Sequence, residues 1–483
     1  MEVCSVARIT SFAHFGLKVL PKLLALSPCS LGKFRKVSPA METETVLRKL
    51  PELLQDVLRK VSPPMETETV VRNLPELPQD VLMDIFSLLE IPDLMRAASV
   101  SSSWRSTYTS LCSQLKLYKR PQTPCLLYTS ESAGENVACL YSLAEKRVYN
   151  LTLPDPPIRS RYLIGSSHGW LVTADDKSEL HLINPVTGQQ IALPSVVTIG
   201  YVEPIFDNAG TVIMYELWEQ LYDPDLDPEM VGPEMITHAP DKLRDHVYIR
   251  VFIFPDPSTG SYIVVLIHGP GCQLSFARVG DCKWTLLTPD WDYDQCIYMD
   301  GLLYASTRAG RMDAFDLTGP TATRNIIADE IAIHSSDSEY RGEFYLLQAP
   351  WGDLLQVCRK AELIDAGYEE LIVKTNKILL HKVDMEAQEL VEINSLHHNV
   401  LFLGRNQSIC LSAEEYPQVK ANCVYFADAE QYNWMYKTNP RDIGVLNLED
   451  GSREEIVSPL WCSWPSPIWL TPSLTVLNLS LYE

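Results

Sequence analysis

Three stretches of the sequence contain residue types and spacings that catalytic or metal-binding sites use. The first, Gly165-Ser166-Ser167-His168-Gly169, fits the G-x-S-x-G pattern, whose central serine attacks a carbonyl group in hydrolases. That chemistry requires a strand before the serine, a sharp turn and a helix after it. Here Trp170-Leu171-Val172-Thr173 follows, and such an apolar run is typical of a strand. The stretch therefore does not predict a nucleophile at Ser167, and a hydrolase is kept only as a rival interpretation.

The second and third stretches offer metal ligands. Four carboxylates occupy positions 1, 3, 5 and 12 of a calcium loop, namely Asp223, Asp225, Asp227 and Glu234. The position that needs glycine is Pro228, and no pair of amphipathic helices flanks the loop. His397-His398 has no carboxylate or thiolate at ligand spacing. We therefore expect no metal, no cofactor and no catalytic residue. Residues 216–245, acidic and rich in proline, are expected to protrude as a loop.

The elements around these stretches are short strands. From about residue 121, apolar strands alternate with polar turns, and one three-strand arrangement recurs at 168–193, 301–327, 353–393 and 423–457. Less complete copies lie at 137–153 and 262–287. Repeating antiparallel units of this kind predict a β-propeller of six or seven blades, with a large β-sandwich as the alternative.

Residues 77–108 instead predict three short helices. Pro78 suits the first turn of the first helix, Pro92 opens the second, and the hydroxyls of Ser101 to Ser103 offer an N-cap to the third. Apolar side chains recur at helical spacing in the first and third: Val81, Leu82, Ile85, Leu88, Leu89, Trp104, Tyr108 and Leu111. About forty residues cannot bury enough area to be stable alone. The stretch therefore predicts a docking module in an α+β multidomain chain.

This helical stretch resembles the F-box family. The resemblance is carried by Leu77-Pro78, the helix to Leu89, Pro92-Asp93-Leu94, and Val100 followed by Trp104-Arg105. It implies docking to a Skp-type adaptor and through it to a cullin, with eight contact residues: Leu77, Pro78, Val81, Leu82, Ile85, Leu89, Val100 and Trp104. Ser101-Ser102 stand where the family commonly has Cys-Lys or Cys-Arg, which we expect to weaken adaptor binding. The alternative is a helical cap that packs on the chain's own downstream domain.

The strand-rich region is similar to the plant C-terminal domain of unknown function 295, the KIB-type propeller. The similarity lies in residues 165–171, 399–405, 416–426 and 469–474. It implies a non-catalytic substrate receptor of an SCF-type E3 ubiquitin ligase, which holds an unknown protein substrate on its propeller. The alternative is a non-ligase interaction scaffold with a vestigial F-box.

Composition limits the partners and the compartment. The net charge of −22 repels nucleic acid phosphates and anionic lipids. No apolar run approaches the roughly 18 residues needed to cross a bilayer. Twelve cysteines without a C-x-x-C pair fit reduced thiols. We therefore expect a protein of the nucleus or cytoplasm that binds neither nucleic acid nor membrane.

The N-terminal region predicts further segments. Residues 1–36 contain six basic residues and one acidic residue, a net charge of +5, and predict a disordered or transit-like leader. A true transit peptide would make the chain organellar. Residues 36–58 nearly repeat 60–82, but the paired prolines 63 and 64 end the first copy. The expected domains are thus a leader (1–36), a truncated duplication and linker (37–73), an F-box (74–120), a KIB-type propeller (121–474) and a C-terminal tail (475–483).

Overall fold

The computed structural model describes residues 78–113, 121–220, 233–256, 259–290, 292–308, 310–319, 322–328, 341–365, 371–416, 418–427, 440–456 and 462–477. The chain forms two compact units, and the second comprises residues 90–92 and everything from Pro121 onward. The predicted leader and duplication lie outside the described residues. No helix in the described ranges has the length and apolar character needed to cross a membrane.

The N-terminal helices are α3 (Gln79–Ser87), α4 (Ile91–Ala98) and α5 (Ser102–Ser113). Helix α3 begins after Pro78, whose carbonyl accepts the N–H of Leu82 at 3.0 Å. Helix α5 begins after Ser101, whose hydroxyl accepts the N–H of Trp104 at 3.2 Å. This bond is the predicted N-cap, which satisfies one of the free donors of the first helical turn. The prediction of three helices is confirmed.

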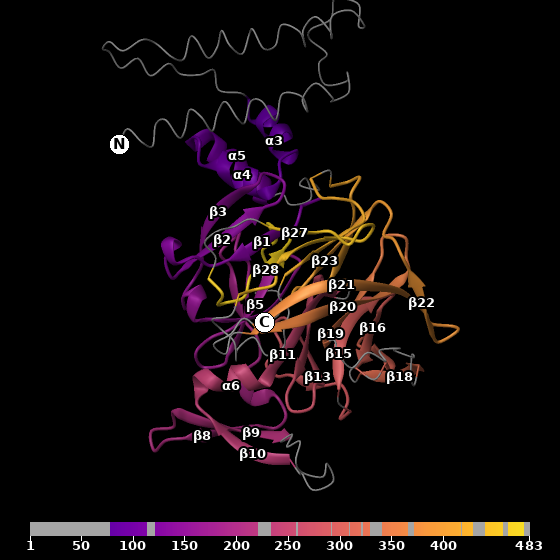
Figure 1. The fold of residues 1–483 in the computed structure, drawn as a ribbon. Coiled ribbons are helices and arrows are strands. Elements are labelled where there is room, and N and C mark those ends of the chain that lie inside the picture. The colour runs from indigo at the N-terminus through magenta and orange to yellow at the C-terminus, as the bar shows by residue number, and fades with distance from the viewer. Residues whose placement is uncertain are drawn as a thin grey trace, which may run out of the picture. The chain divides into compact units, whose positions relative to one another are not determined.

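In the described part of the second unit, six sheets follow one another around a ring (Figure 1). We number these blades 1 to 6. Blade 1 contains β28 (Ile468–Leu470), β1 (Cys125–Tyr128), β2 (Val137–Ser142) and β3 (Arg147–Thr152). Blade 2 contains β4 (Tyr162–Ser167), β5 (Trp170–Ala174), β6 (Leu180–Ile183) and β7 (Gln190–Ala192). Blade 3 contains β11 (Tyr248–Asp256), β12 (Ser261–His268), β13 (Gln273–Arg278) and β14 (Thr285–Leu286).

Blades 4 and 5 have the same antiparallel plan, whereas blade 6 contains one parallel pair, β23 with β25. Blade 4 contains β15 (Tyr293–Met299), β16 (Leu302–Thr307), β17 (Met312–Asp316) and β18 (Thr323–Ala328). Blade 5 contains β19 (Arg341–Gln348), β20 (Leu354–Asp365), β21 (Leu371–Asp384) and β22 (Glu389–Ile393). Blade 6 has five strands, in the order β24 (Ile409–Ser412), β23 (Asn399–Leu403), β25 (Cys423–Phe426), β26 (Gly444–Asn447) and β27 (Arg453–Glu455).

Contacts between the first strands of successive blades define the ring. Strand β4 lies against β28 and β11, β15 lies against β11 and β19, and β19 lies against β24. Blades 6 and 1 meet through buried aromatic rings, and the rings of Phe402 and Trp469 pack edge to face at 5.2 Å. The predicted propeller is therefore confirmed. The sandwich alternative is wrong, because the sheets follow one another around a ring and do not form two stacked layers.

Blade 1 is built from segments at opposite ends of the propeller sequence. Strand β28 pairs antiparallel with β1, and Leu127 faces Ile468. The predicted repeats contain β2 and β3 but not this pairing. Residues beyond β28 also pack on blade 2, where Asn184 Nδ2 donates to the carbonyls of Ser473 and Thr475 at 3.1 and 3.0 Å. The first residues of the predicted C-terminal tail are thus held by blade 2.

An additional sheet lies outside the ring between blades 2 and 3. It consists of β8 (Val202–Phe206), β9 (Val212–Gln220) and β10 (Pro233–His238), followed by α6 (Pro240–Val247). We call it the inserted sheet. The expectation of a loop over residues 216–245 is wrong for the described part, since β9 and β10 pair in register, with Leu217 opposite Ile236. The prolines are compatible because Pro233 begins a strand and Pro240 begins a helix.

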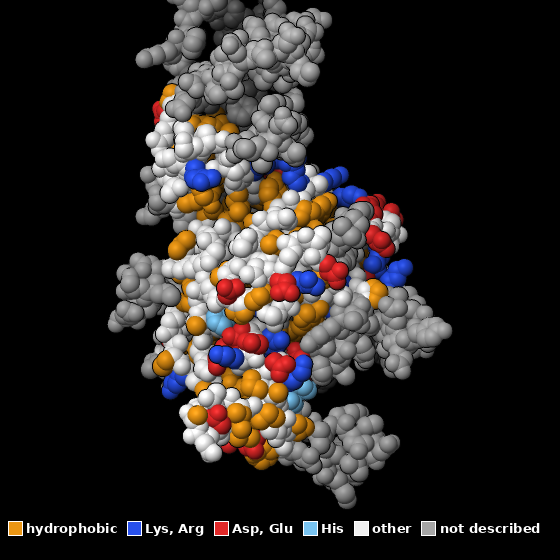
Figure 2. Space-filling model, turned by 90° about the vertical axis from the view of Figure 1, so that its left-hand side faces the viewer, with side chains coloured by type: hydrophobic (Ala, Val, Ile, Leu, Met, Phe, Trp, Pro, Cys, Tyr) orange, Lys and Arg blue, Asp and Glu red, His pale blue; other side chains and the backbone are white. Residues whose placement is uncertain are grey.

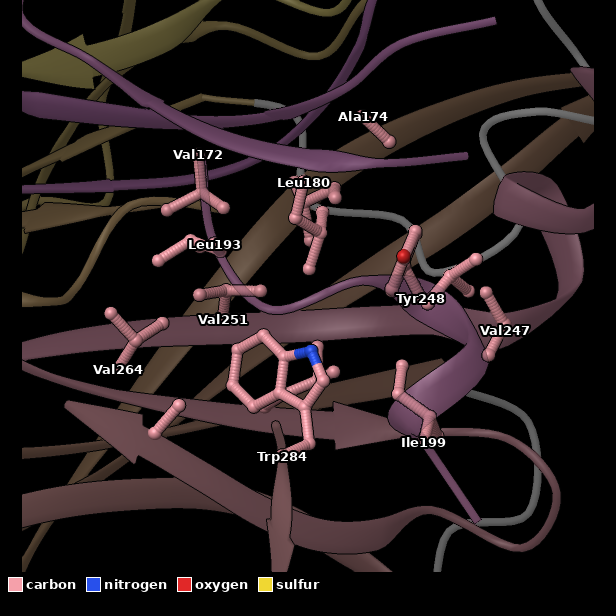
Figure 3. Close-up of a cluster of buried hydrophobic side chains, with 14 of the residues drawn as sticks. Val172, Ala174, Leu180, Leu193, Ile199, Val247, Tyr248, Val251, Val264 and Trp284 are labelled. Carbon is pink, nitrogen blue, oxygen red and sulfur yellow. The ribbon is translucent and has the colours of Figure 1, made fainter. Parts of the chain in front are cut away.

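A shared core joins blades 2 and 3 (Figure 3). Val172 and Leu180 of blade 2 and Val251 and Val264 of blade 3 are all buried in this cluster. Trp284 closes it, and its indole N–H donates to the carbonyl of Pro194 at 3.0 Å. Three short 3₁₀ turns, η2 (Glu131–Ala133), η3 (Ile158–Ser160) and η4 (Val196–Thr198), connect strands of blades 1 and 2 and the inserted sheet. Helix α6 contributes Leu243 and Val247 to the same core.

Candidate protein-interaction sites

Helix α3 has an exposed side that begins at its first residues. Pro78 is exposed, and Val81 keeps 37% of its surface accessible. Asp80 and Asp84 are exposed near them. Val81 therefore keeps accessible apolar surface beside two exposed carboxylates. This side of α3 is therefore available to a partner.

The remaining predicted contact residues lie deeper. Leu82, Ile85 and Leu89 are buried, and Val100 and Trp104 are half-buried. Leu77 lies outside the described residues. The apolar stripe predicted for this helix therefore divides, with Val81 on its open side and Leu82, Ile85 and Leu89 in the interior. A substitution at a buried position would disturb the helices as well as any contact they make.

Phe86 is a residue of this unit that the predicted contact set omits. It is fully buried, and its ring packs edge to face on Trp104 with centroids 5.4 Å apart. Such aromatic pairs stabilise a protein by about 1 kcal/mol beyond the area they bury. The signal was present, because Phe86 lies four residues after Leu82 on the same helical stripe. Trp104 therefore holds α5 against α3, whatever else it contacts.

The serines that depart from the F-box pattern have a structural explanation. Ser101 and Ser102 are exposed, and the Ser101 hydroxyl caps α5. Serine is among the strongest N-capping residues, and replacing such a cap by alanine costs about 1 kcal/mol. The departure thus stabilises the start of α5. Its effect on adaptor binding stays a prediction.

The G-x-S-x-G stretch forms a tight hairpin. Ser167 pairs with Trp170 at the ends of β4 and β5, and His168 and Gly169 between them have φ angles of 51° and 86°. Two successive positive φ angles are typical of a type I′ turn, which joins strands. A strand therefore follows the serine, as predicted, and the helix of a nucleophile elbow is absent there. The Ser167 hydroxyl donates to Gln407 Oε1.

Three of the family-like stretches meet at β4. The Ser166 hydroxyl donates to the Trp469 carbonyl, and the Ser166 carbonyl accepts the N–H of Gln407 at 2.9 Å. Arg405 donates through Nη1 to the hydroxyl of Tyr162 and the carbonyl of Leu163, each at 3.1 Å. Residues 165–171, 399–407 and 469–474 thus join blades 1, 2 and 6. These stretches therefore help to hold the ring together.

Gly169 is required by this junction as well as by the turn. A Cβ atom at this position would lie 2.2 Å from Cβ of Ser473, and its positive φ is strained for other residues. Ser473 belongs to the segment that follows β28. The β4–β5 turn of blade 2 therefore packs closely against the residues that follow β28.

A buried charge network joins blades 5 and 6. Asp442 accepts hydrogen bonds from Arg359 Nη2 at 2.8 Å and from the Thr375 N–H at 2.7 Å, and Arg453 Nη2 lies 2.7 Å from its other oxygen. Burial alone would raise the pKa of Asp442, but Arg359, Thr375 and Arg453 lower it below its ordinary value. Arg359 also donates to the Ala427 carbonyl at 3.0 Å. The buried carboxylate of Asp442 therefore links blades 5 and 6.

The residues considered above as metal ligands lie partly outside the described ranges. Asp223, Asp225 and Asp227 lie outside the described residues. His397 and His398 are exposed at the start of β23. Across the described ranges, no group of three or more His, Cys, Asp or Glu side chains is arranged to hold a metal ion.

Comparison with known proteins links both units to named families. A family model described as KIB1-4 beta-propeller matches residues 140–447, and one described as F-box-like matches residues 74–121. F-box protein KIB4 of Arabidopsis thaliana is 24% identical over 397 residues, which cover 80% of this chain and 90% of that protein. The resemblances predicted from the sequence are confirmed by these matches.

Two solved structures are similar at low identity. TolB from Acinetobacter baumannii has a TM-score of 0.32 and 8% identity, covering 77% of this chain and 73% of that chain. A protein from Lactobacillus plantarum has a TM-score of 0.33 and 11% identity, covering 72% of this chain and 99% of that chain.

Proposed function

Since this chain belongs to the KIB1-4 β-propeller family, we propose that it is the substrate-receptor subunit of an SCF-type E3 ubiquitin ligase. The observation that carries the proposal is the presence of an F-box and a complete propeller in one chain. The F-box binds a Skp-type adaptor, and through it a cullin. The propeller holds a protein substrate.

The exposed side of α3 provides the first contact surface in this proposal. Val81 is its central apolar side chain and Pro78 extends it toward the start of the helix. Leu82, Ile85, Phe86 and Trp104 keep the helices in place behind it. Burying a large part of an exposed valine on association stabilises a complex by about 1.5–2 kcal/mol.

The proposed receptor accelerates ubiquitin transfer by proximity. It holds a substrate lysine near a ubiquitin-conjugating enzyme, so that a bimolecular encounter becomes an intramolecular one. The covalent chemistry belongs to the other subunits, and this chain supplies no nucleophile. We place its action in the nucleus or cytoplasm, where the other subunits are available.

The test is quantitative capture of a plant Skp adaptor and cullin by the full chain and by Val81→Asp. We expect the aspartate variant to lose about thirtyfold in adaptor affinity, equivalent to about 2 kcal/mol. Val148→Asp is the matched control, since Val148 is 41% exposed on the outermost strand of blade 1. It should capture the adaptor like the wild type. Circular dichroism should show equal helix content in all three proteins.

Two outcomes would refute the proposal. Equal adaptor capture by the wild type and Val81→Asp would show that α3 is not the contact surface. No capture by the wild type, with its helices intact, would favour the scaffold with a vestigial F-box. Leu82→Asp and Trp104→Ala are less informative, because both side chains also support the helices.

A further inference from the structure

The inserted sheet has apolar side chains on both faces. Strand register places Val202, Leu217 and Ile236 on one face, together with Tyr215. Val202, Tyr215 and Leu217 are buried in the core shared by blades 2 and 3 and α6. This inner face accounts for how the sheet is attached to the propeller.

The opposite face is partly accessible, since Ile205, Met214 and Trp218 are half-buried and Met235 is exposed. Paired positions place Ile205 beside Met214, and Trp218 beside Met235, all pointing away from the core. On this face Met235 is 39% exposed. Ile213 and Phe206 are also exposed, but they lie at the irregular end of the β8–β9 pair, where Phe206 is opposite Val212, and strand register does not place them on this face. An antiparallel sheet with one covered face normally has a polar second face. Contiguous exposed apolar side chains instead mark an interaction surface.

The same face is acidic. Glu203 and Glu216 lie directly opposite each other on β8 and β9, between the apolar pairs. Like charges in this arrangement destabilise a sheet. Figure 2 shows hydrophobic side chains with acidic ones among them at the lower end of the second unit, where Figure 1 places β8, β9 and β10.

The sequence of the inserted sheet contains no Lys or Arg to balance its carboxylates. Residues 201–238 contain no Lys or Arg but nine acidic residues: Glu203, Asp207, Glu216, Glu219, Asp223, Asp225, Asp227, Glu229 and Glu234. The next cations in the sequence are on α6. Arg244 donates to the carbonyls of Ser160 and Asp175 of blade 2, at 2.9 and 2.7 Å, and Lys242 lies 3.4 Å from Asp241. A partner that brings cations to Glu203 and Glu216 would relieve the repulsion between them.

We propose that the outer face of the inserted sheet binds an amphipathic segment of a protein substrate in which Lys or Arg side chains flank apolar ones. The apolar side chains cover Ile205, Met214, Trp218 and Met235, and the cations pair with Glu203 and Glu216. This inference rests on the proposed function, since it names the class of protein that the receptor holds. A second copy of this chain does not fit, because two such acidic faces repel each other.

The probe is a short fluorescent peptide with leucine and lysine at helical spacing, compared with the same peptide carrying glutamate for lysine. Binding to the full chain is measured by fluorescence anisotropy. The wild type should bind the lysine peptide, more weakly as salt is raised, and should not bind the glutamate peptide. Met214→Thr/Met235→Thr and Glu203→Lys/Glu216→Lys should each weaken binding by about tenfold or more. Glu203→Lys/Glu216→Lys should gain affinity for the glutamate peptide.

Two control variants make the same changes in hydrophobicity and net charge as the test variants, but on other blades. Ile326→Thr/Val391→Thr removes similarly exposed apolar side chains from β18 and β22, and Glu389→Lys/Glu449→Lys makes the same charge change on blades 5 and 6. Both should bind the lysine peptide like the wild type. If they lose affinity equally, binding depends on overall charge or hydrophobicity and the proposal is overturned.

Three further outcomes decide the matter. Absence of binding to the lysine peptide overturns the proposal. Binding that appears only after deletion of residues 1–36 also overturns it, because the chain's own basic leader would then be the occupant. Adaptor capture is measured on the same variants and should not change. Loss of adaptor capture by every protein, wild type included, would refute the ligase assignment. The peptide-binding measurement would still test the docking surface independently.

Discussion

The blades of the ring and the inserted sheet use charge in opposite ways. In blades 5 and 6, Asp442 is buried between Arg359 and Arg453, so that opposite charges join neighbouring sheets. In the inserted sheet, the exposed Glu203 faces the half-buried Glu216, with apolar neighbours on the same face. Paired buried charges cannot be separated without a large free-energy cost, whereas exposed like charges can accept an external partner. Charge thus stabilises the junction between blades in the ring, whereas in the inserted sheet it is available for binding another molecule.

Removing the buried carboxylate tests the first half of this contrast most strongly. Asp442→Ala should lower the free energy of unfolding by about 3–5 kcal/mol, because Arg359 and Arg453 lose their counter-charge in the interior. Hydrogen exchange should rise in blades 5 and 6, and denaturant unfolding gives the magnitude. Asp353→Ala is the control, since its ion pair with Lys382 is partly exposed and contributes about 1 kcal/mol or less. Equal losses in the two variants would contradict the contrast.

A second prediction concerns His268, a buried polar residue of the ring whose protonation should destabilise the fold. Burial, opposed by a hydrogen bond to the Gly269 carbonyl, lowers the pKa of His268 from 6.5 to about 4. Nδ1 donates to that carbonyl and Nε2 accepts the Ser275 hydroxyl, both at 2.9 Å, so the ring is neutral. Between pH 6.5 and 4, His268 is protonated in the unfolded chain but neutral in the folded one. Its contribution to the free energy of unfolding is therefore fully present above pH 6.5 and is lost as the pH falls to about 4. The total loss is about 3 kcal/mol.

Denaturant unfolding across this pH range checks the prediction. His268→Asn should flatten the profile between pH 6.5 and 4, since asparagine keeps a donor and an acceptor without titrating. A wild-type profile that His268→Asn does not alter would show that this imidazole plays no part.

The smallest expected effect lies in the inserted sheet. Glu203→Lys replaces a like-charge pair with Glu216 by an opposite pair and should stabilise the protein by about 0.2–1 kcal/mol. Glu203→Lys/Glu216→Lys restores a like-charge pair and should return stability to the wild-type value. Thermal unfolding measures both. A stability loss in the single variant would mean that Glu203 already has a favourable partner, and the contrast with the ring would fail.

The sequence predicted the outer strands of each blade but not the innermost ones. The repeats recovered β5–β7, β12–β14, β16–β18, β20–β22 and β25–β27, because their turns and apolar alternation are local. The inner strands β11 and β15 carry charges that interrupt an apolar run. Arg250 lies 3.9 Å from Asp294 of the next blade, and its guanidinium lies over the ring of Tyr345, 5.6 Å from the centroid. Partners so distant in the sequence cannot be read from a local pattern.

The candidate docking helix was predicted in position but not in orientation. Helical spacing identified an apolar stripe containing Val81 and Leu82, yet only the structure shows that Val81 is exposed and Leu82 buried. The inserted sheet was not predicted, because a segment rich in acidic residues and proline usually forms a loop. Register then decides which of its side chains face outward, and a shift of one residue would exchange the two faces.

The pairing of β28 with β1 has a consequence for synthesis of the chain. The partner of the first propeller strand, Ile468–Leu470, leaves the ribosome more than three hundred residues after Cys125–Tyr128. Until then, the edge of β1 stays without its neighbour and is a template for pairing with another chain. A messenger truncated between the two segments would yield a protein with this edge permanently open. We expect such products to aggregate or be cleared, so that only complete translation releases a closed propeller.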